Sequence, residues 1–463
     1  MNVPYWVQDA IFYQIFPDRF ANGDARNDPI NVKPWGSPPT VEGYQGGDLR
    51  GIIDNFDYLL DLGINALYLN PIFRASSTHR YNTADYFQID PFLGSLRDFQ
   101  RLIEVAHGNG VRVVLDGVFN HCGRGFFAFT DLLEFQEESP YRDWFTVNRF
   151  PLDAYSQGEA EDYAAWWGYK ALPKLNFSNP AVQQYFLEVT RYWLRQGIDG
   201  WRLDVPNEIQ EDVFWVNFRR TVESENPDAY ILGEIWDFNP PWVDDNHCHG
   251  LMNYPLRSGI LEFVKGKTPV LHSIEGIEKT LFGYPRPNAY AMYQLIGSHD
   301  IERILTLVGG EAKRVKLAYT LLFGLPGAPA VYYGDEIGVE GGKDPDCRRA
   351  MIWDRAGWNQ EIRDHVKALI QLRKRLVTSR RGDYTRILHN EKGVYVYARR
   401  LGGECLMVAL NNSTVRKTVS LKVSTLGLRD GQILRDHLSG EDFIVSGDTL
   451  NLTLPAIGGM WLS

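Results

Sequence analysis

Two patterns of apolar residues divide the chain into a longer and a shorter part. In the longer part, short apolar runs alternate with amphipathic helical stretches, and several of these stretches end next to glycine (Gly63, Gly110 and Gly197). Apolar runs that are separated by helices are typical of parallel strands in βα units. Seven runs are clear, at 10–16, 64–70, 111–120, 197–205, 229–236, 291–300 and 328–336, and a weak one lies at 250–256.

Eight βα units favour a (β/α)8 barrel over a doubly wound sheet, and a barrel needs about 250 residues, more with insertions. The longest interval between runs contains residues 122–175, which are loop-like and rich in aromatic residues. We interpret them as a small domain inserted after the third strand. The catalytic barrel then comprises residues 1–121 and 176–380.

The pattern changes after residue 380. Short segments alternate apolar and polar residues with period two and are separated by turns. This alternation is typical of antiparallel strands with one buried face. We therefore expect an α/β protein in which residues 381–463 form a C-terminal antiparallel β-sandwich.

Composition excludes several classes of function. The net charge of −10 argues against a nucleic acid or an anionic membrane as partner. The 463 residues contain no apolar run of membrane-spanning length, no signal peptide pattern, and only four cysteines. We expect a cytoplasmic protein. Aromatic residues make up 13%, which suits either a large core or a binder of neutral, flat-faced ligands.

Polar side chains gather at the C-terminal ends of the expected strands. This end of a barrel carries the active site, whereas the strands themselves should be apolar. Any one of these residues alone could belong to a structural ion pair, but acids and histidines at matching ends of successive strands are hard to explain in that way. They are Asp116, Asn120, His121, Arg202, Asp204, Glu234, His299 and Asp300.

Two or three acids without a metal-type cluster of His and Cys suggest acid–base chemistry at a C–O bond. Glycoside hydrolysis needs one carboxyl group to protonate the leaving oxygen and a second to attack carbon or activate water. Crowded carboxyl groups raise one another's pKa, so that one of them stays protonated near neutral pH.

Four blocks of the sequence resemble the α-amylase family, glycoside hydrolase family 13. They are DGVFNH (116–121), GWRLDV (200–205), GEIW (233–236) and GSHD (297–300), in the family's order and spacing. The resemblance covers essentially the whole chain and implies a retaining mechanism. By this resemblance Asp204 is the nucleophile, Glu234 is the general acid/base, and Asp300 is the third carboxylate that holds sugar hydroxyls.

The same resemblance implies the residues that bind the sugar at the scissile bond. Arg202 would keep Asp204 ionised by charge pairing. His121 and His299 match ligands of sugar hydroxyls, and Asp116 belongs to the same substrate-binding group. Tyr81, in the sequence HRY, matches the aromatic residue that stacks on this sugar, although packing within a loop is the alternative.

Within the family, LPKLN (172–176) and GGKDPDCRR (341–349) resemble the neopullulanase, cyclomaltodextrinase and maltogenic amylase group. This implies that Asp344 and Arg348 reach a donor-side glucose and that Trp236 stacks on the acceptor side. The expected substrates are the α-1,4 bonds of maltooligosaccharides, cyclodextrins or pullulan, with α-1,6 cleavage as an additional activity. That group carries an extra N-terminal domain for dimerisation, whereas this barrel starts near Met1, so both a monomer and a homodimer remain open.

The loop FANGDARNDP (20–29) is a candidate calcium site. Short oxygen side chains suit a hard cation such as Ca²⁺, which takes six to eight oxygen ligands. The loop resembles the calcium loop of the neopullulanase group, and a plain Asx-turn loop is the alternative. We expect a structural role for the ion, because the loop lies beside the first strand rather than beside the acids. The candidate ligands on the loop are Asn22, Asp24, Asn27 and Asp28, and the resemblance adds the Gly46 carbonyl and Asp48.

Two other functions remain open at this stage. A family 13 α-glucanotransferase would use the same catalytic residues, and only the access of water to the acceptor side would differ. A non-catalytic, sugar-binding or transporter-associated family member is a remote alternative, because such proteins lose catalytic acids or carry a membrane span. No organic cofactor is expected.

Overall fold

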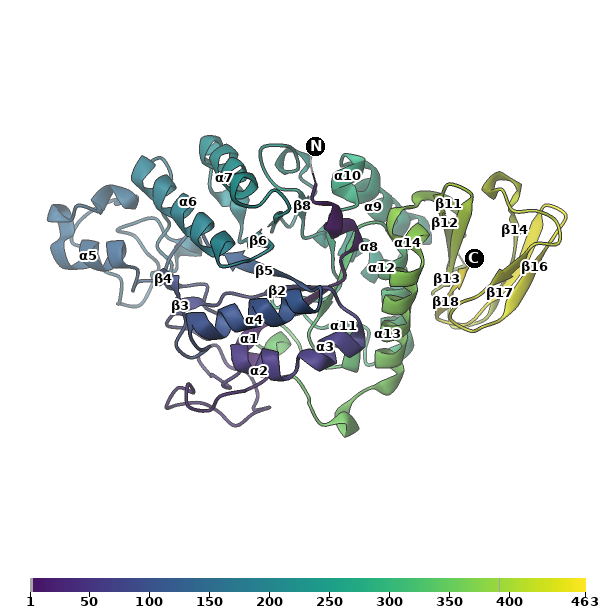
Figure 1. Ribbon diagram of the computed structural model, residues 1–463, viewed down its shortest axis with the longest axis horizontal. Helices are drawn as coiled ribbons and strands as arrows, with labels where there is room; N and C mark the ends of the chain where they lie inside the picture. The colour runs from purple at the N-terminus through teal and green to yellow at the C-terminus, as the bar shows by residue number, and fades with distance from the viewer. Residues whose placement is uncertain (1–2, 391) are drawn as a thin grey trace.

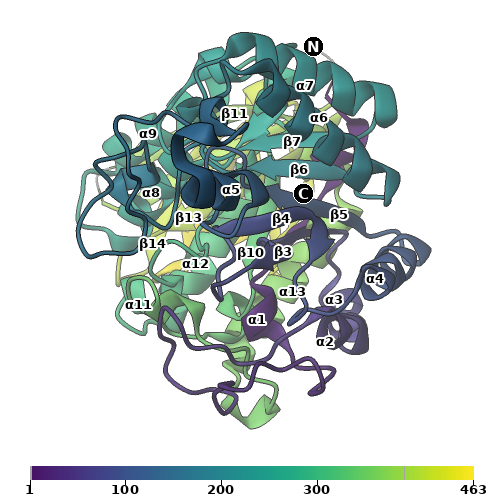
Figure 2. The same ribbon diagram turned by 90° about the vertical axis from the view of Figure 1, so that its left-hand side faces the viewer.

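The computed structural model describes residues 3–390 and 392–463 and shows a barrel with a smaller unit at each end of its long axis (Figure 1). The inserted segment with α5 (Phe127–Phe135) lies at one end and the C-terminal sheets lie at the other. Figure 2 looks at the molecule from the α5 end, and there α5 and its loops lie in front of the barrel strands.

The barrel contains eight parallel strands in the order β8-β7-β6-β5-β2-β1-β10-β9. A parallel bridge between Met252 and Tyr293 joins the two ends of this order. Alternate side chains point into the barrel, where large residues such as Phe12, Tyr68 and Tyr230 are fully buried. The strands are β1 (Phe12–Ile15), β2 (Ala66–Leu69), β5 (Arg112–Gly117), β6 (Gly200–Leu203), β7 (Tyr230–Gly233), β8 (Gly250–Leu251), β9 (Tyr293–Gln294) and β10 (Ala328–Tyr332).

Helices surround the strands and bury one apolar face against them. Helix α4 begins with a capping box, in which Ser95 and Asp98 each accept a backbone N–H of the other. Helix α3 ends at Gly63, whose φ of 97° is left-handed. The longer helices are α3 (Phe56–Leu62), α4 (Leu96–Gly108), α6 (Pro180–Arg195), α7 (Asp212–Glu225), α8 (Tyr254–Lys265), α9 (Val270–Phe282), α12 (Ala312–Gly324) and α13 (Gln360–Arg375); the shorter ones are α1 (Pro17–Phe20), α2 (Leu49–Asp54), α10 (Arg286–Ala289), α11 (Ile304–Leu307) and α14 (Val377–Arg381).

Two segments interrupt the regular alternation of strands and helices. A hairpin of β3 (Phe73–Ala75) and β4 (Thr83–Ile89), which the apolar pattern did not predict, follows the second barrel strand. Residues 122–175 contain α5 (Phe127–Phe135), short 3-10 helices and isolated bridges. This segment is therefore loop-rich, as the sequence indicates.

The C-terminal part is an antiparallel sandwich of two four-stranded sheets around a separate apolar core. The sequence pattern identifies six of its strands but not β11 and β18. One sheet consists of β11 (Asp383–Asn390), β12 (Val394–Leu401), β13 (Glu404–Asn411) and β18 (Gly458–Leu462), and the other of β14 (Lys417–Lys422), β17 (Thr449–Leu454), β16 (Asp442–Ser446) and β15 (Ile433–Arg435). Among the described residues, every helix is too short or too polar to cross a bilayer.

Candidate active site

Three acidic side chains meet at the C-terminal end of the barrel. Asp204 directly follows β6, Glu234 directly follows β7, and Asp300 lies in the loop after β9. Asp204 and Glu234 are 9% and 4% exposed. The Asp300 side chain is more open, at 26%. The strands therefore bring together the three acids that the sequence singles out, in a setting that is largely shielded from water.

Arg202 is the counter-charge of this cluster. Its side chain is fully buried, and its Nη1 lies 2.7 Å from Asp116 Oδ1 and 3.1 Å from Asp204 Oδ1. Its Nη2 lies 2.9 Å from Glu234 Oε2. Asp116 and Glu234 hold the pKa of Arg202 well above its usual value despite burial. One permanently charged guanidinium group therefore contacts three carboxyl groups.

Burial changes the protonation of the acids. Desolvation raises the pKa of Asp204 well above 3.8, the charge of Glu234 adds to this effect, and Arg202 opposes it. Desolvation and Glu234 also raise the pKa of Asp300, to about 7. The cluster can therefore hold a proton near neutral pH, which a general acid requires.

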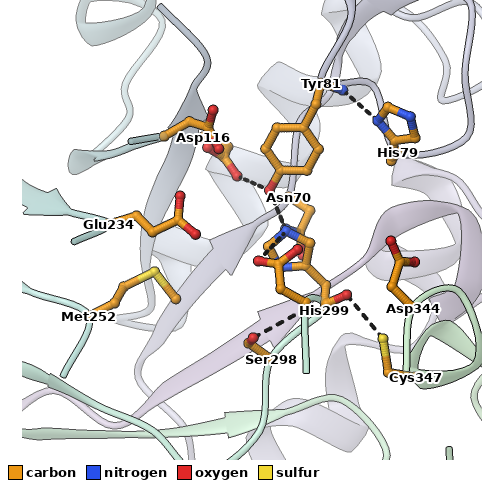
Figure 3. Close-up of polar contacts among 12 residues, drawn as sticks. Asn70, His79, Tyr81, Asp116, Glu234, Met252, Ser298, His299, Asp344 and Cys347 are labelled. Carbon is orange, nitrogen blue, oxygen red and sulfur yellow. Dashed lines mark hydrogen bonds and ion pairs between the residues drawn. The ribbon is translucent and has the colours of Figure 1, made fainter. Parts of the chain in front are cut away.

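Tyr81 and His299 form the centre of a hydrogen-bond network (Figure 3). Gln14 Nε2 donates to His299 Nδ1 at 2.9 Å, so the ring proton must be on Nε2. This nitrogen faces the Tyr81 hydroxyl at 2.6 Å and Asp300 Oδ2 at 3.2 Å. The Tyr81 hydroxyl in turn donates to Asp116 at 2.8 Å, and its ring is nearly parallel to that of His299.

His121 lies at the base of the inserted segment and is 1% exposed. Burial lowers its pKa to about 3, so the ring is neutral over the physiological range. Its Nε2 atom is buried without a hydrogen-bond partner. A buried polar atom of this kind is costly unless something pairs with it. A sugar hydroxyl would be a suitable partner.

The expected donor-side and acceptor-side residues lie around the acids. Arg348 pairs with Asp344 at 3.0 Å and with Asp300 at 3.4 Å. Figure 3 shows Asp344 on the opposite side of Tyr81 and His299 from Glu234. Trp236 is 45% exposed and stacks on Tyr254 at 3.9 Å between ring centroids. Its indole N–H donates to Glu234 Oε1 at 3.2 Å, so it adjoins the acid/base candidate.

Sequence reasoning missed three residues of the network. Gln14 is on β1, and Asn70 follows β2 and donates to the Tyr81 hydroxyl at 3.1 Å. Tyr68, on β2, donates to Asp116 at 2.6 Å. A polar residue at or near the C-terminal end of an otherwise apolar strand is the signal that could have identified Gln14 and Asn70.

The candidate calcium residues come together only in part. The Asn27 Oδ1 atom is buried without a partner, which leaves an oxygen free for a cation. Asn22 and Asp28 contact each other and pack against Gly46. The Asp48 carboxylate instead accepts backbone N–H groups, including those of Gly23 and Gly51.

The remaining predicted ligand, Asp24, faces Arg26 at 2.6 Å, and this pairing lowers its pKa to about 2. Among the described residues, no group of three or more His, Cys, Asp and Glu side chains is arranged to hold a metal. A cation in this loop would therefore depend on amide and carbonyl oxygens as well as carboxylates.

Residues 14–378 match the α-amylase catalytic domain, and residues 382–457 match the α-amylase C-terminal domain. The chain belongs to the α-amylase family. It is a glycoside hydrolase, because relatives named cyclomaltodextrinase and neopullulanase, 42–43% identical over nearly the whole chain, are glycoside hydrolases.

Three proteins illustrate the similarity. Cyclomaltodextrinase of Geobacillus thermopakistaniensis is 43% identical over 461 residues, which is 99% of this chain and 77% of that protein. The intracellular maltogenic amylase of Bacillus subtilis is 39% identical over 91% of this chain and 71% of its own length. The structure of cyclic α-maltosyl-(1→6)-maltose hydrolase from Arthrobacter globiformis has a TM-score of 0.91 and 39% identity, with 100% of both chains covered.

Proposed function

We propose that the protein hydrolyses α-1,4-glucosidic bonds with retention of configuration, with Asp204 as nucleophile and Glu234 as acid/base. The observation that carries this proposal is the single guanidinium group of Arg202, which contacts both carboxyl groups at 3.1 and 2.9 Å. The two acids therefore lie within the span of one guanidinium group. Retaining glycosidases place their two acids about 5 Å apart, whereas inverting enzymes leave room for a water between them, and contact with one shared guanidinium group favours the closer pair.

The chemical steps follow from these positions. Glu234 protonates the glycosidic oxygen while Asp204 attacks the anomeric carbon, so the leaving sugar departs and a covalent glycosyl ester forms. Glu234, now a carboxylate, then removes a proton from water, and this water displaces Asp204 from the carbon. Arg202 orients Asp204 for the attack and favours its ionised form, because its positive charge opposes part of the rise in pKa that burial and Glu234 cause.

The neighbouring side chains hold the sugar that carries the scissile bond. The Tyr81 ring offers a flat apolar face, and His299 Nε2 and Asp300 lie beside it. The unpartnered His121 Nε2 supplies a further contact for a hydroxyl. Asp344 and Arg348 bind the next glucose on the donor side, and Trp236 stacks on the acceptor-side sugar.

The substrate class is short α-glucans, linear or cyclic, with α-1,6 cleavage as a second activity. Support comes from the names of the relatives, which act on cyclomaltodextrin or on a cyclic sugar with an α-(1→6) link. The test is a product time course on maltotriose, β-cyclodextrin, pullulan and panose. Glucose and maltose should dominate from maltotriose with the α-anomer released first. Products longer than maltotriose, if dominant, would identify a glucanotransferase instead.

We also propose a structural Ca²⁺ in the 20–29 loop, supported by the free Asn27 Oδ1 and by the adjoining Asn22, Asp28 and Gly46. The ion would link this loop to the start of α2, whose N-terminal residue is preceded by Asp48. EDTA should then lower the melting temperature by several degrees, and added Ca²⁺ should restore it. An Asn27→Ala variant should melt lower than wild type in Ca²⁺ and should not respond to EDTA; the same response in both proteins contradicts the site.

The location and assembly of the protein are part of this proposal. A cytoplasmic enzyme is supported by the relative named intracellular maltogenic amylase. Cell fractionation followed by immunoblotting tests this location. A monomer or a homodimer is expected, and light scattering after size-exclusion chromatography distinguishes the two.

A further inference from the structure

The exposed indole of Trp167 is not used by the proposed mechanism. It belongs to the sequence WWGY (166–169) of the inserted segment and is 75% exposed. Tryptophan is a largely buried residue on average, because its ring carries a large apolar area. A tryptophan that is held out in solvent therefore suggests a ligand.

The backbone at Trp167 is strained in a way that presents the ring. Its φ and ψ are 47° and 30°, in the left-handed region that residues with a Cβ rarely adopt. Gly168, with a φ of 74°, follows it. Such strain persists only where the surroundings impose it, and it is commonest at functional sites.

Hydrogen bonds make the surrounding loop rigid. Trp166 N donates to Leu172 O at 2.8 Å, and Ala160 N donates to Gly168 O at 2.8 Å. The Tyr163 hydroxyl donates to Lys170 O at 2.8 Å. The exposed ring is therefore preorganised, and a ligand that stacks on it would lose little binding free energy to ordering of the loop.

The ring of Trp167 is connected to the catalytic centre by stacking. It lies 5.2 Å from the Trp166 ring at an angle of 18°, and Trp166 lies 5.9 Å from the His121 ring at 8°. The three nearly parallel rings thus extend from His121, the buried candidate partner of a sugar hydroxyl, through Trp166 to the exposed Trp167. Because Trp166 covers one side of the Trp167 indole, the other side is available to a sugar.

We propose that Trp167 is a sugar-stacking residue for a glucosyl unit outside the catalytic centre, so that it favours longer α-glucans over short ones. The apolar face of a glucose ring suits a flat aromatic surface, as it does at Tyr81. This inference rests on the proposed function, because it takes the ligand to be an extension of the same α-glucan. Trp166 would be a positioning residue that holds both Trp167 and His121.

The test compares substrates of different length. Trp167→Gly removes the ring and fits the left-handed backbone, so this variant should melt no lower than wild type. We expect its KM for maltoheptaose to rise about tenfold, with kcat nearly unchanged. Stacking on an aromatic ring strengthens binding by about the same factor. The KM for maltotriose should stay within about twofold of wild type.

Two further variants serve as controls. Trp167→Phe keeps a ring and should recover most of the affinity for maltoheptaose. Tyr155→Ala removes another exposed aromatic ring of the inserted segment, 74% exposed and outside the stack, and should change neither KM. Equal effects of Trp167→Gly on maltotriose and maltoheptaose, or no effect on either, would overturn the proposal.

A binding measurement separates this proposal from the proposed function. Calorimetric titration of maltoheptaose into Glu234→Gln, with and without Trp167→Gly, measures affinity without turnover. Weaker binding in the double variant supports the stacking role even if wild type hydrolyses none of the substrates. Unchanged binding in the double variant refutes the stacking role even if wild type is an active hydrolase.

Discussion

Two arginines are fully buried at opposite ends of the barrel, and they are held in different ways. Arg202, at the C-terminal end, contacts three carboxyl groups, and its pKa is raised. Arg373, near the N-terminal end of β10, donates to backbone carbonyls, including those of Phe323, Leu325 and Gly327. Burial and the neighbouring Arg399 lower its pKa to about 9.

The comparison shows two uses of a buried charge. Arg373 ties the end of α13 to the chain that enters β10 and to Ser379 in α14, next to the C-terminal sheets. Its hydrogen-bond partners are carbonyl dipoles that cannot titrate, so Arg373 has a structural role. Arg202 has partners whose protonation changes during the reaction. Because three carboxyl groups share one arginine, the cluster can retain a proton for catalysis. The same excess of carboxyl groups lowers the stability of this end of the barrel.

The largest effect should come from the nucleophile. Asp204→Asn keeps the shape of the side chain but removes the attacking oxygen's charge, so kcat for maltotriose should fall by more than about 10⁴-fold. The circular dichroism spectrum should be unchanged. Asp57→Asn, an exposed substitution on α3, is the control and should retain full activity. One tenth of wild-type activity in Asp204→Asn would refute the assignment.

Replacement of each arginine by Met should have a different effect, on turnover for Arg202 and on stability for Arg373. Arg202→Met should abolish turnover, because three acids lose the cation that they share and Asp204 takes up a proton. Arg373→Met should lower the free energy of unfolding by about 3 kcal/mol, because several buried carbonyls lose their donor. Its kcat per folded molecule at 25 °C should match wild type. Urea unfolding and active-site titration measure these two quantities. A marked fall of kcat in folded Arg373→Met would show that the two ends are coupled.

Differences in burial between strands explain which elements the sequence could predict. The eight barrel strands are recognisable because strands buried on both faces are continuous apolar runs. In the sandwich, β11 is mostly polar and half exposed, and β18 begins with two glycines, so neither shows a strong alternation. The hairpin β3–β4 is similarly irregular, with register shifts at Arg74.

The candidate site likewise contains residues that the sequence identifies and residues that it does not. Charged residues at strand ends were identifiable, because a charge contradicts an apolar run. The roles of Gln14 and Tyr68 were not, because they depend on the side chains that face them in the barrel, His299 for Gln14 and Asp116 for Tyr68. Such pairings between individual side chains are not contained in the linear pattern. The strain at Trp167 likewise becomes visible only in the backbone angles.

A smaller effect is expected at Gln14, which determines the tautomer of His299. Gln14→Leu removes the donor to His299 Nδ1, so the ring proton is no longer confined to the nitrogen that faces Tyr81 and Asp300. We expect kcat/KM for maltotriose to fall about tenfold, a typical loss for one hydrogen bond to a binding residue. The pH profile should broaden on the acidic side. A loss below twofold would mean that His299 is positioned by other contacts.

The smallest effect should be the pH dependence of stability at Asp300. Its pKa is about 7 in the folded state and 3.8 as an isolated group. Between these values the folded state binds more protons than the unfolded state, so stability falls as pH rises from about 4 to 7 and stays lower above 7. Asp300→Asn cannot lose a proton, and it should therefore melt about 2–4 °C above wild type at pH 8.

The same variant should approach wild type toward pH 4, because Asp300 is then protonated in the folded protein and resembles Asn. Differential scanning calorimetry at pH 4, 6 and 8 measures this convergence. An equal difference at all three values would mean that Asp300 titrates like an exposed carboxyl group, with Arg348 at 3.4 Å offsetting its burial. In that case the buried charges at the acidic end of the barrel would be as fully compensated by their partners as the charge of Arg373 is. The proton for catalysis would then have to reside on the pair of Asp204 and Glu234 alone.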